Sequence, residues 1–308
     1  MMNRRQFISL AAAAGSTSLL SGAVANTLPL GDICRTRPSA GLRKINATYS
    51  GELVIAGTRL FKEGFLDDLL PLYREASGNR ATMLGGGCDD GVAGVRLASA
   101  HLGGVCCPLD SPPSKGLAGY QVANDMKVIL AHPSVTTNNV SLAQLKGILR
   151  GGILNWAALG GADQSISLVV HDHCPDYLEP MRQTLLGDKP IWSSQAMQVK
   201  TDQKHLETVA RFPGAVGVNS WILAEPFVRS GQLKLLRLDG VEPTLRNTEN
   251  GKYPLAGPLI LIFERWNGHM HPLFSFMYSD AGRKVLAQRV IPVTAQQAGY
   301  RRTGAIRT

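Results

Sequence analysis

Sulfur and imidazole side chains are concentrated in a few short segments of this 308-residue sequence. Four of the five cysteines and two of the seven histidines lie in three segments: Cys88; Cys106 and Cys107; His171, His173 and Cys174. Thiolate and imidazole groups select soft or borderline partners such as Zn, Cu(I), iron–sulfur centres or trivalent arsenic species. If the three segments converge in the fold, these six side chains are the predicted metal ligands.

Two other interpretations of the thiols stay open. In an oxidising compartment Cys88 would pair with Cys106 or Cys107, and Cys34 with Cys174, although five cysteines cannot all pair within one chain. The thiols would otherwise be inert packing groups. His171 and His173 have a simpler alternative as well, in which one of them caps a helix or faces water.

Polar groups near the thiols suggest a different ligand. Thr58 and Arg59 supply a hydroxyl and a cation, and Asp89 and Asp90 follow Cys88 directly. For an oxyanion, Arg59 would be the anchor, while Thr58, Asp90 and backbone N–H groups would complete the site. The alternatives are a solvated Arg59 and an Asp pair that interacts only with the dipole of a helix N-terminus.

The elements that must position these residues alternate between strands and helices. Runs of small and β-branched residues predict strands over 52–57, 102–108, 128–131, 167–170, 214–218 and 259–263. Helical periodicity predicts helices after residue 65, just after Gly91, after a Ser141–Gln144 capping box, and around 180–186. This alternation indicates parallel sheets in an α/β fold, in which ligands bind outside the carboxyl ends of the strands.

Composition agrees with a globular protein of two domains. Hydrophobic residues make up 44% and charged residues 18% of the chain. The formal charge is +9, from 32 Lys and Arg against 23 Asp and Glu, and it falls to +7 without Arg4 and Arg5. The basic residues are scattered and no basic run is interleaved with aromatics, so we expect no nucleic-acid partner.

Residues 1–25 have the pattern of an export signal. Arg4 and Arg5 precede Phe7, an apolar stretch runs from 10 to 20, and Ala23-Val24-Ala25 resembles a cleavage site. The paired arginines favour the twin-arginine route, with an ordinary secretory signal as the alternative. The stretch is too short for a membrane span, which needs about 20 apolar residues. We therefore predict a periplasmic protein whose residues 26–48 form an irregular N-terminal arm.

From Leu53 to Val293 the order of motifs resembles the phosphate-binding proteins of ABC-type phosphate importers. The motifs that carry this resemblance are Ser141–Ile148, Asn155-Trp156, Gly160-Gly161, Leu238–Thr244 and Asn250–Leu255. The resemblance implies a periplasmic binding protein fold with two α/β lobes joined by two strands, closing on the ligand in a cleft. The first lobe would comprise 49–131 and 246–308, and the second 132–245, with crossings near His132 and Arg246.

The binding loops depart from the family pattern. The family wraps its oxyanion in loops rich in Gly and hydroxyl side chains, and Cys88 stands where a Ser of such a loop is expected. Cys106 and Cys107 fall where a Ser-Arg-like pair precedes Pro, and the segment from His171 replaces a stretch that contains Arg and an acid. The resemblance therefore places the cysteines at the ligand, and sulfur in place of oxyanion donors predicts an altered ligand.

The sequence thus predicts a periplasmic substrate-binding protein that holds a transition metal (Cu, Zn or Fe) or a thiophilic solute. It would act as a monomer and deliver its ligand to an ABC transporter membrane complex or a periplasmic sensor. The alternatives are binding of phosphate or a related oxyanion, and a redox protein with a metal centre. The resemblance to binding proteins implies no enzymatic activity. The sequence has no Cys-x-x-Cys-His, His-Glu-x-x-His or Gly-x-Ser-x-Gly motif, so covalent c-type heme and the two enzyme classes with the latter motifs lose support.

Overall fold

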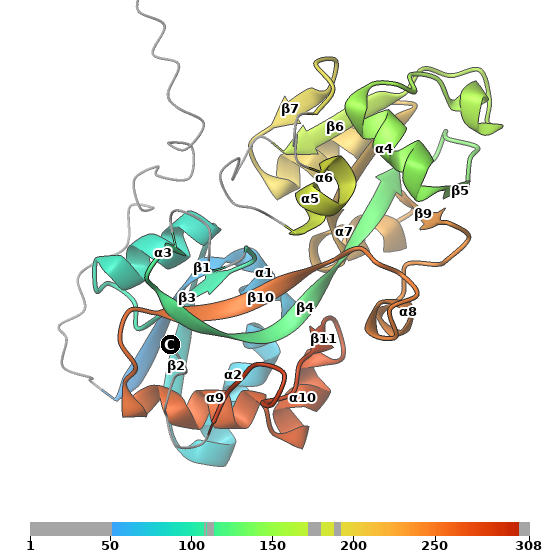
Figure 1. Cartoon of the computed structure of the whole chain (residues 1–308). Helices are drawn as coiled ribbons and strands as arrows, with labels where there is room; N and C mark the ends of the chain where they lie inside the picture. Colours follow the sequence, from blue (N-terminus) through green and yellow to red (C-terminus); the bar gives the residue numbers. More distant parts are fainter. Residues whose placement is uncertain (1–50, 108, 110–113, 172–179, 188–191, 302–308) are drawn as a thin grey trace, which may run out of the picture.

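A curled, mixed β-sheet with flanking helices forms the protein (Figure 1). The computed structural model describes residues 51–107, 109, 114–171, 180–187 and 192–301. The predicted signal segment 1–25, the arm 26–48, and Cys34, His173 and Cys174 lie outside the described residues. Within the described part of the chain, no helix is long and apolar enough to cross a membrane.

The strands and helices have the following bounds. The strands are β1 (Glu52–Thr58), β2 (Arg80–Gly86), β3 (Leu102–Val105), β4 (Ala118–Ala131), β5 (Asn139–Val140), β6 (Ser167–His171), β7 (Met197–Val199), β8 (Ala215–Ser220), β9 (Lys234–Leu238), β10 (Ala256–Phe263) and β11 (Ile291–Pro292). The helices are α1 (Arg59–Phe61), the π-helix η2 (Lys62–Leu66), α2 (Asp67–Ser77), α3 (Cys88–Arg96), α4 (Leu142–Arg150), the 3-10 helix η4 (Trp156–Leu159), α5 (Pro180–Leu186), α6 (Asp202–Arg211), α7 (Trp221–Arg229), α8 (Leu245–Glu249), the 3-10 helix η5 (Gly268–Met270), α9 (His271–Met277) and α10 (Asp280–Leu286).

Two groups of strands are joined through the long strand β4, and we call them lobes. In the first lobe β2, β1 and β3 run parallel, and β10 pairs antiparallel with β3. In the second lobe β7, β6 and β8 run parallel. Strand β4 pairs with β10 up to Met126 and with β8 from Lys127 onward, so it changes partners at this point (Figure 1). The predicted α/β fold is confirmed, with antiparallel strands added at the junction; the exact residue division between lobes stays a prediction.

The local signals in the sequence explain several helices. Helix α4 begins with the predicted capping box, in which the Gln144 N–H donates to Ser141 Oγ at 3.1 Å and the Ser141 N–H to Gln144 Oε1 at 2.7 Å. It ends at Gly151, whose φ of 78° is a left-handed conformation that glycine adopts at low cost. Both ends of this helix are therefore fixed by residues visible in the sequence.

The predicted start of α3 was wrong, because the helix begins at Cys88 and not after Gly91. Gly87 is its N-cap, and the Gly87 N–H donates to the Asp90 carboxylate at 2.8 Å. Gly91 therefore lies inside the first turns, a position that usually disfavours glycine. Residues 80–86 form strand β2, which the sequence patterns did not predict.

Close packing of α3 against β3 explains the glycine at 91. A Cβ on Gly91 would lie 2.8 Å from the Gly104 carbonyl oxygen, and a Cβ on Gly103 would lie 2.4 Å from the Gly91 oxygen. Both separations are too short for real atoms, so helix and strand touch backbone to backbone only because neither carries a side chain there. This contact brings the N-terminus of α3 to the carboxyl end of β3.

Gly103→Ala should therefore separate α3 from β3 and destabilise the protein by roughly 1–3 kcal/mol, the usual cost of overpacking. Chemical denaturation measures this loss. Gly268→Ala is the matched control, because a Cβ at Gly268 meets nothing within 4 Å. Equal stabilities for the two variants would contradict the packing argument.

Candidate functional site

Three cysteines meet at the carboxyl edge of the first-lobe sheet. Cys106 and Cys107 follow the last residue of β3, and Cys88 is the first residue of α3. Their sulfur atoms all lie within 4.8 Å of one another. Cys88 Sγ is 3.1 Å from Cys106 Sγ and accepts a hydrogen bond from the Cys106 N–H at 3.2 Å. We call Cys88, Cys106 and Cys107 the thiol cluster.

The thiol cluster is largely sheltered from solvent, and the pKa of one of its thiols is raised. Cys88 and Cys107 are buried and Cys106 is half-buried, and the structure joins none of the three in a disulfide. A hydrogen bond with Cys107 lowers the pKa of Cys106, but the hydrogen bond with Cys88 and burial outweigh it, so this pKa lies well above its ordinary value.

The spacing of the sulfurs suits a soft cation. Zinc–sulfur bonds measure about 2.3 Å, so two sulfurs on one ion lie at most about 4.6 Å apart. The distance of 3.1 Å between the Cys88 and Cys106 sulfurs is within this limit. The partial positive charge at the N-terminus of α3 also favours thiolates there. No other group of three potential metal ligands lies this close together among the residues that the structure describes.

Thr58 and Arg59 lie at the end of β1 but serve local roles. The buried Thr58 Oγ1 accepts a hydrogen bond from the Leu60 N–H and caps α1. Arg59 pairs with Glu63 at 2.6 Å while half of its side chain, 49%, stays exposed. The predicted anchor for an oxyanion is thus held by a carboxylate.

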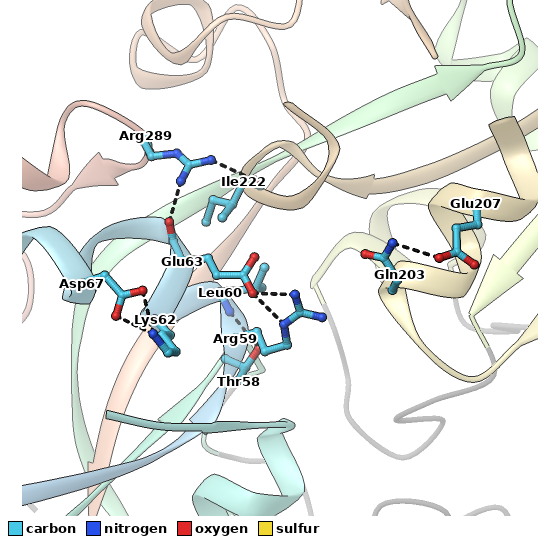
Figure 2. A network of polar contacts seen from close by, with 10 residues as sticks. All are labelled: Thr58, Arg59, Leu60, Lys62, Glu63, Asp67, Gln203, Glu207, Ile222 and Arg289. Carbon is cyan, nitrogen blue, oxygen red and sulfur yellow. Dashed lines mark hydrogen bonds and ion pairs between the residues drawn. The ribbon is translucent and has the colours of Figure 1, made fainter. Parts of the chain in front are cut away.

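Arg59 and Glu63 line a pocket of about 420 Å³ that also involves Gln203 and Arg289. Figure 2 shows Arg59 folded against Glu63, with Gln203 and Glu207 on α6 across from them. Arg289 Nη1 donates to the Glu63 carbonyl oxygen and Nη2 to that of Ile222 on α7, so it ties α7 to η2. The pocket is lined by charges of both signs.

Asp89 and Asp90 are both in the first turn of α3. Asp90 is buried, and its carboxylate receives the Gly87 N–H already described. Asp89 is half-buried beside it. The structure therefore gives Asp90 the role of stabilising the helix terminus on which Cys88 sits.

His171 lies at the carboxyl end of β6 in the second lobe and is not part of the thiol cluster. Its Nε2 is 3.1 Å from Asp202 Oδ1, and its ring stacks on that of His205 with centroids 4.5 Å apart. His205 is fully buried between the Val169 carbonyl and Asn219. His173 and Cys174 follow in the chain but lie outside the described residues, so their predicted role is untested.

Sequence reasoning missed a buried ion pair where β4 changes partners. Lys127 Nζ lies 2.9 Å from Asp125 Oδ2, and Ser220 Oγ donates to Asp125 Oδ1 at 2.8 Å. Burial raises the pKa of Asp125, the charge of Lys127 opposes that shift, and the charge of Asp202 adds to it. The available signal was the alternation Asp125-Met126-Lys127 directly before the apolar run 128–131.

Comparisons with known proteins agree with this architecture. The family model described as PBP superfamily domain matches residues 43–284. The phosphate-binding protein PstS of Bacillus subtilis is 27% identical over 210 residues, which cover 67% of this chain and 68% of that protein.

Two solved structures share the fold. A putative phosphate ABC transporter substrate-binding protein with bound phosphate, from Clostridium perfringens, has a TM-score of 0.67 at 18% identity and covers 79% of this chain and 100% of its own. An ABC-type phosphate transport receptor from Vibrio cholerae has a TM-score of 0.59 at 20% identity, with the same coverage of 79% and 100%.

Mild oxidation should join Cys88 to Cys106, because their sulfurs are 3.1 Å apart. The attacking species is the thiolate, and the raised pKa of Cys106 keeps its population low near neutrality. The rate of cross-linking should therefore increase as the pH rises. Peptide mapping of the oxidised protein identifies the pair; a Cys88–Cys107 product, or a rate independent of pH, would contradict this geometry.

Proposed function

The chain belongs to the PBP superfamily, and we propose that it is a substrate-binding protein whose thiol cluster holds a soft cation or a thiophilic solute. The observation that supports it is that three cysteine sulfurs, from the start of α3 and the end of β3, lie within 4.8 Å of one another. The similarity to a phosphate-binding protein supports the part of this proposal that concerns substrate binding. The sulfur donors argue for Cu, Zn, Fe or trivalent arsenic as the ligand.

Loading exchanges protons for the cation. Each thiol must lose its proton to bind, so affinity increases with pH. The raised pKa of Cys106 extends this dependence to higher pH. His171, His173 and Cys174 would approach from the second lobe and complete the coordination as the lobes close, in the manner of periplasmic binding proteins.

The protein would bind and deliver its ligand without catalysis. We propose that it is exported through the twin-arginine route, acts as a monomer in the periplasm, and passes its ligand to an ABC transporter membrane complex or a sensor. Two relatives support delivery of the ligand to a transporter, because they are named as a phosphate-binding protein and a phosphate ABC transporter substrate-binding protein. Arg4 and Arg5 support the export route.

Each of the substitutions Cys88→Ser, Cys106→Ser and Cys107→Ser should weaken binding of Cu(I) and Zn²⁺ by more than roughly tenfold. Even residues that only hydrogen-bond to a metal ligand change metal affinity by about this factor. Competition against a chromophoric chelator measures the affinities. Cys34→Ser is the control, because this cysteine lies outside the three predicted segments. Wild-type protein that takes up no soft cation under reducing conditions would overturn the proposal.

Phosphate or a related oxyanion is the second candidate, and the phosphate-binding relatives favour it. In this case Arg59 would leave Glu63 to reach the anion, and Arg59→Gln should weaken phosphate binding by roughly tenfold or more. Calorimetry on metal-free protein with counted thiols measures this. Arg229→Gln removes a comparable exposed pair with Glu225 and serves as the control. Absence of phosphate binding in the wild type would eliminate this candidate.

A further inference from the structure

Access from solvent differs among the three cysteines of the thiol cluster. Cys106 is half-buried, whereas Cys88 and Cys107 have exposed fractions of only 5% and 2%. A reagent in solution therefore meets Cys106 first. The sulfur of the buried Cys88 is 3.1 Å from the sulfur of Cys106. The cluster thus combines one accessible thiol with a buried thiol in contact with it.

This pair is also close to the geometry of a disulfide. A disulfide holds its two sulfurs about 2.05 Å apart, so the sulfurs of Cys88 and Cys106 have to approach by roughly 1 Å. The two cysteines come from different elements, the start of α3 and the segment after β3. These elements are held together by the backbone contact between Gly91 and Gly103. The packing that brings the sulfurs together therefore also prepares the cysteines for a disulfide.

Exchange with an external disulfide oxidises such a pair in two steps. The sulfur of Cys106 attacks the reagent, forms a mixed disulfide and releases one reagent thiol. The sulfur of Cys88 then attacks the Cys106 sulfur of the mixed disulfide and releases the second reagent thiol. Overall, the two cysteine thiols lose two protons and two electrons. The external disulfide gains both and becomes two thiols.

The Cys88–Cys106 disulfide would remove two of the three donors of the thiol cluster. Of the three sulfurs that lie within 4.8 Å of one another, only the sulfur of Cys107 would remain a thiol. The thiolate is the metal ligand, and a disulfide sulfur cannot become one without reduction. A bound cation in turn engages the sulfurs that attack the external disulfide. Cation binding and oxidation therefore oppose each other, in both directions.

Resting on the proposed function, we propose that Cys88 and Cys106 form a thiol–disulfide switch that controls capture and release of the soft cation. The dithiol form binds the cation, and exchange with a small or protein-borne disulfide releases it. Cys106 is the thiol that meets the oxidant, and Cys88 is the thiol that resolves the mixed disulfide. In the oxidising compartment that the export signal predicts, oxidants of this class are present.

The test measures Zn²⁺ affinity of the full-length protein after equilibration with glutathione of increasing oxidised fraction and removal of the glutathione. Reduced wild-type protein should bind Zn²⁺. Once peptide mapping finds the Cys88–Cys106 disulfide, the affinity should be lower by more than roughly hundredfold, because two ligands are lost and each should cost at least about tenfold. Reduction should restore binding, and protein loaded with Zn²⁺ should be oxidised more slowly than metal-free protein.

Single variants separate the roles of the cysteines. Cys88→Ser should stop at the mixed disulfide, with glutathione retained on the peptide that contains Cys106. Cys106→Ser should leave Cys88 and Cys107 as thiols, because both are buried. Cys107→Ser retains the reacting pair, so the Cys88–Cys106 disulfide should still form. Cys34→Ser is the matched control and should behave as the wild type, because it makes the same chemical change outside the thiol cluster.

An oxidised wild-type protein that contains the Cys88–Cys106 disulfide and keeps its Zn²⁺ affinity overturns the inference while the proposed function stands. Failure of this disulfide to form in fully oxidised glutathione overturns it as well, and so does a mapped disulfide that joins other cysteines of the cluster. Reduced wild-type protein that takes up no Zn²⁺ overturns the inference together with the proposed function.

Discussion

The direct contact between the backbones of α3 and β3 is the constraint on which the site depends. Gly91 and Gly103 leave no room for a side chain between helix and strand. Because α3 lies this close, its first residue, Cys88, reaches the residue after β3, Cys106. Asp90 then holds the N-terminus of the helix through the Gly87 N–H. The sulfurs of Cys88 and Cys106 are therefore close together because the backbones of α3 and β3 pack directly against each other.

The chemical behaviour of the thiol cluster depends on its electrostatic surroundings. The hydrogen bond with Cys88 and burial keep the pKa of Cys106 well above its ordinary value. A cation that displaces the thiol protons creates a complex whose net charge must be balanced in a region from which water is excluded. Elsewhere, at the junction of the lobes, a buried lysine, Lys127, pairs with Asp125, whose carboxylate also accepts a hydrogen bond from Ser220 Oγ.

Hydrophobic periodicity and capping signals in the sequence were sufficient to predict much of the fold. The strands β1, β6 and β10 and the capped helix α4 follow from local patterns, and the concentration of cysteines at strand ends pointed to Cys88, Cys106 and Cys107. The start of α3 was misjudged because glycine normally disfavours a helix, whereas here tertiary packing requires it at Gly91. The edge strand β2 was missed because its glycines resemble a turn.

The remaining features depend on contacts between distant residues. His171 has the residue type of a metal ligand, yet its neighbours are Asp202 and His205, which no local spacing reveals. Arg59 has the charge of an anion anchor, but Glu63, four residues later, neutralises it. The ion pair of Lys127 forms at a change of strand partners, and only the three-dimensional register shows that it is buried.

X-ray absorption at the metal edge tests the central claim most directly, on the reduced full-length protein loaded with Zn²⁺. The account predicts a first shell that contains three sulfur atoms at about 2.3 Å. A shell made only of nitrogen and oxygen would contradict it, because the metal would then lie away from Cys88, Cys106 and Cys107.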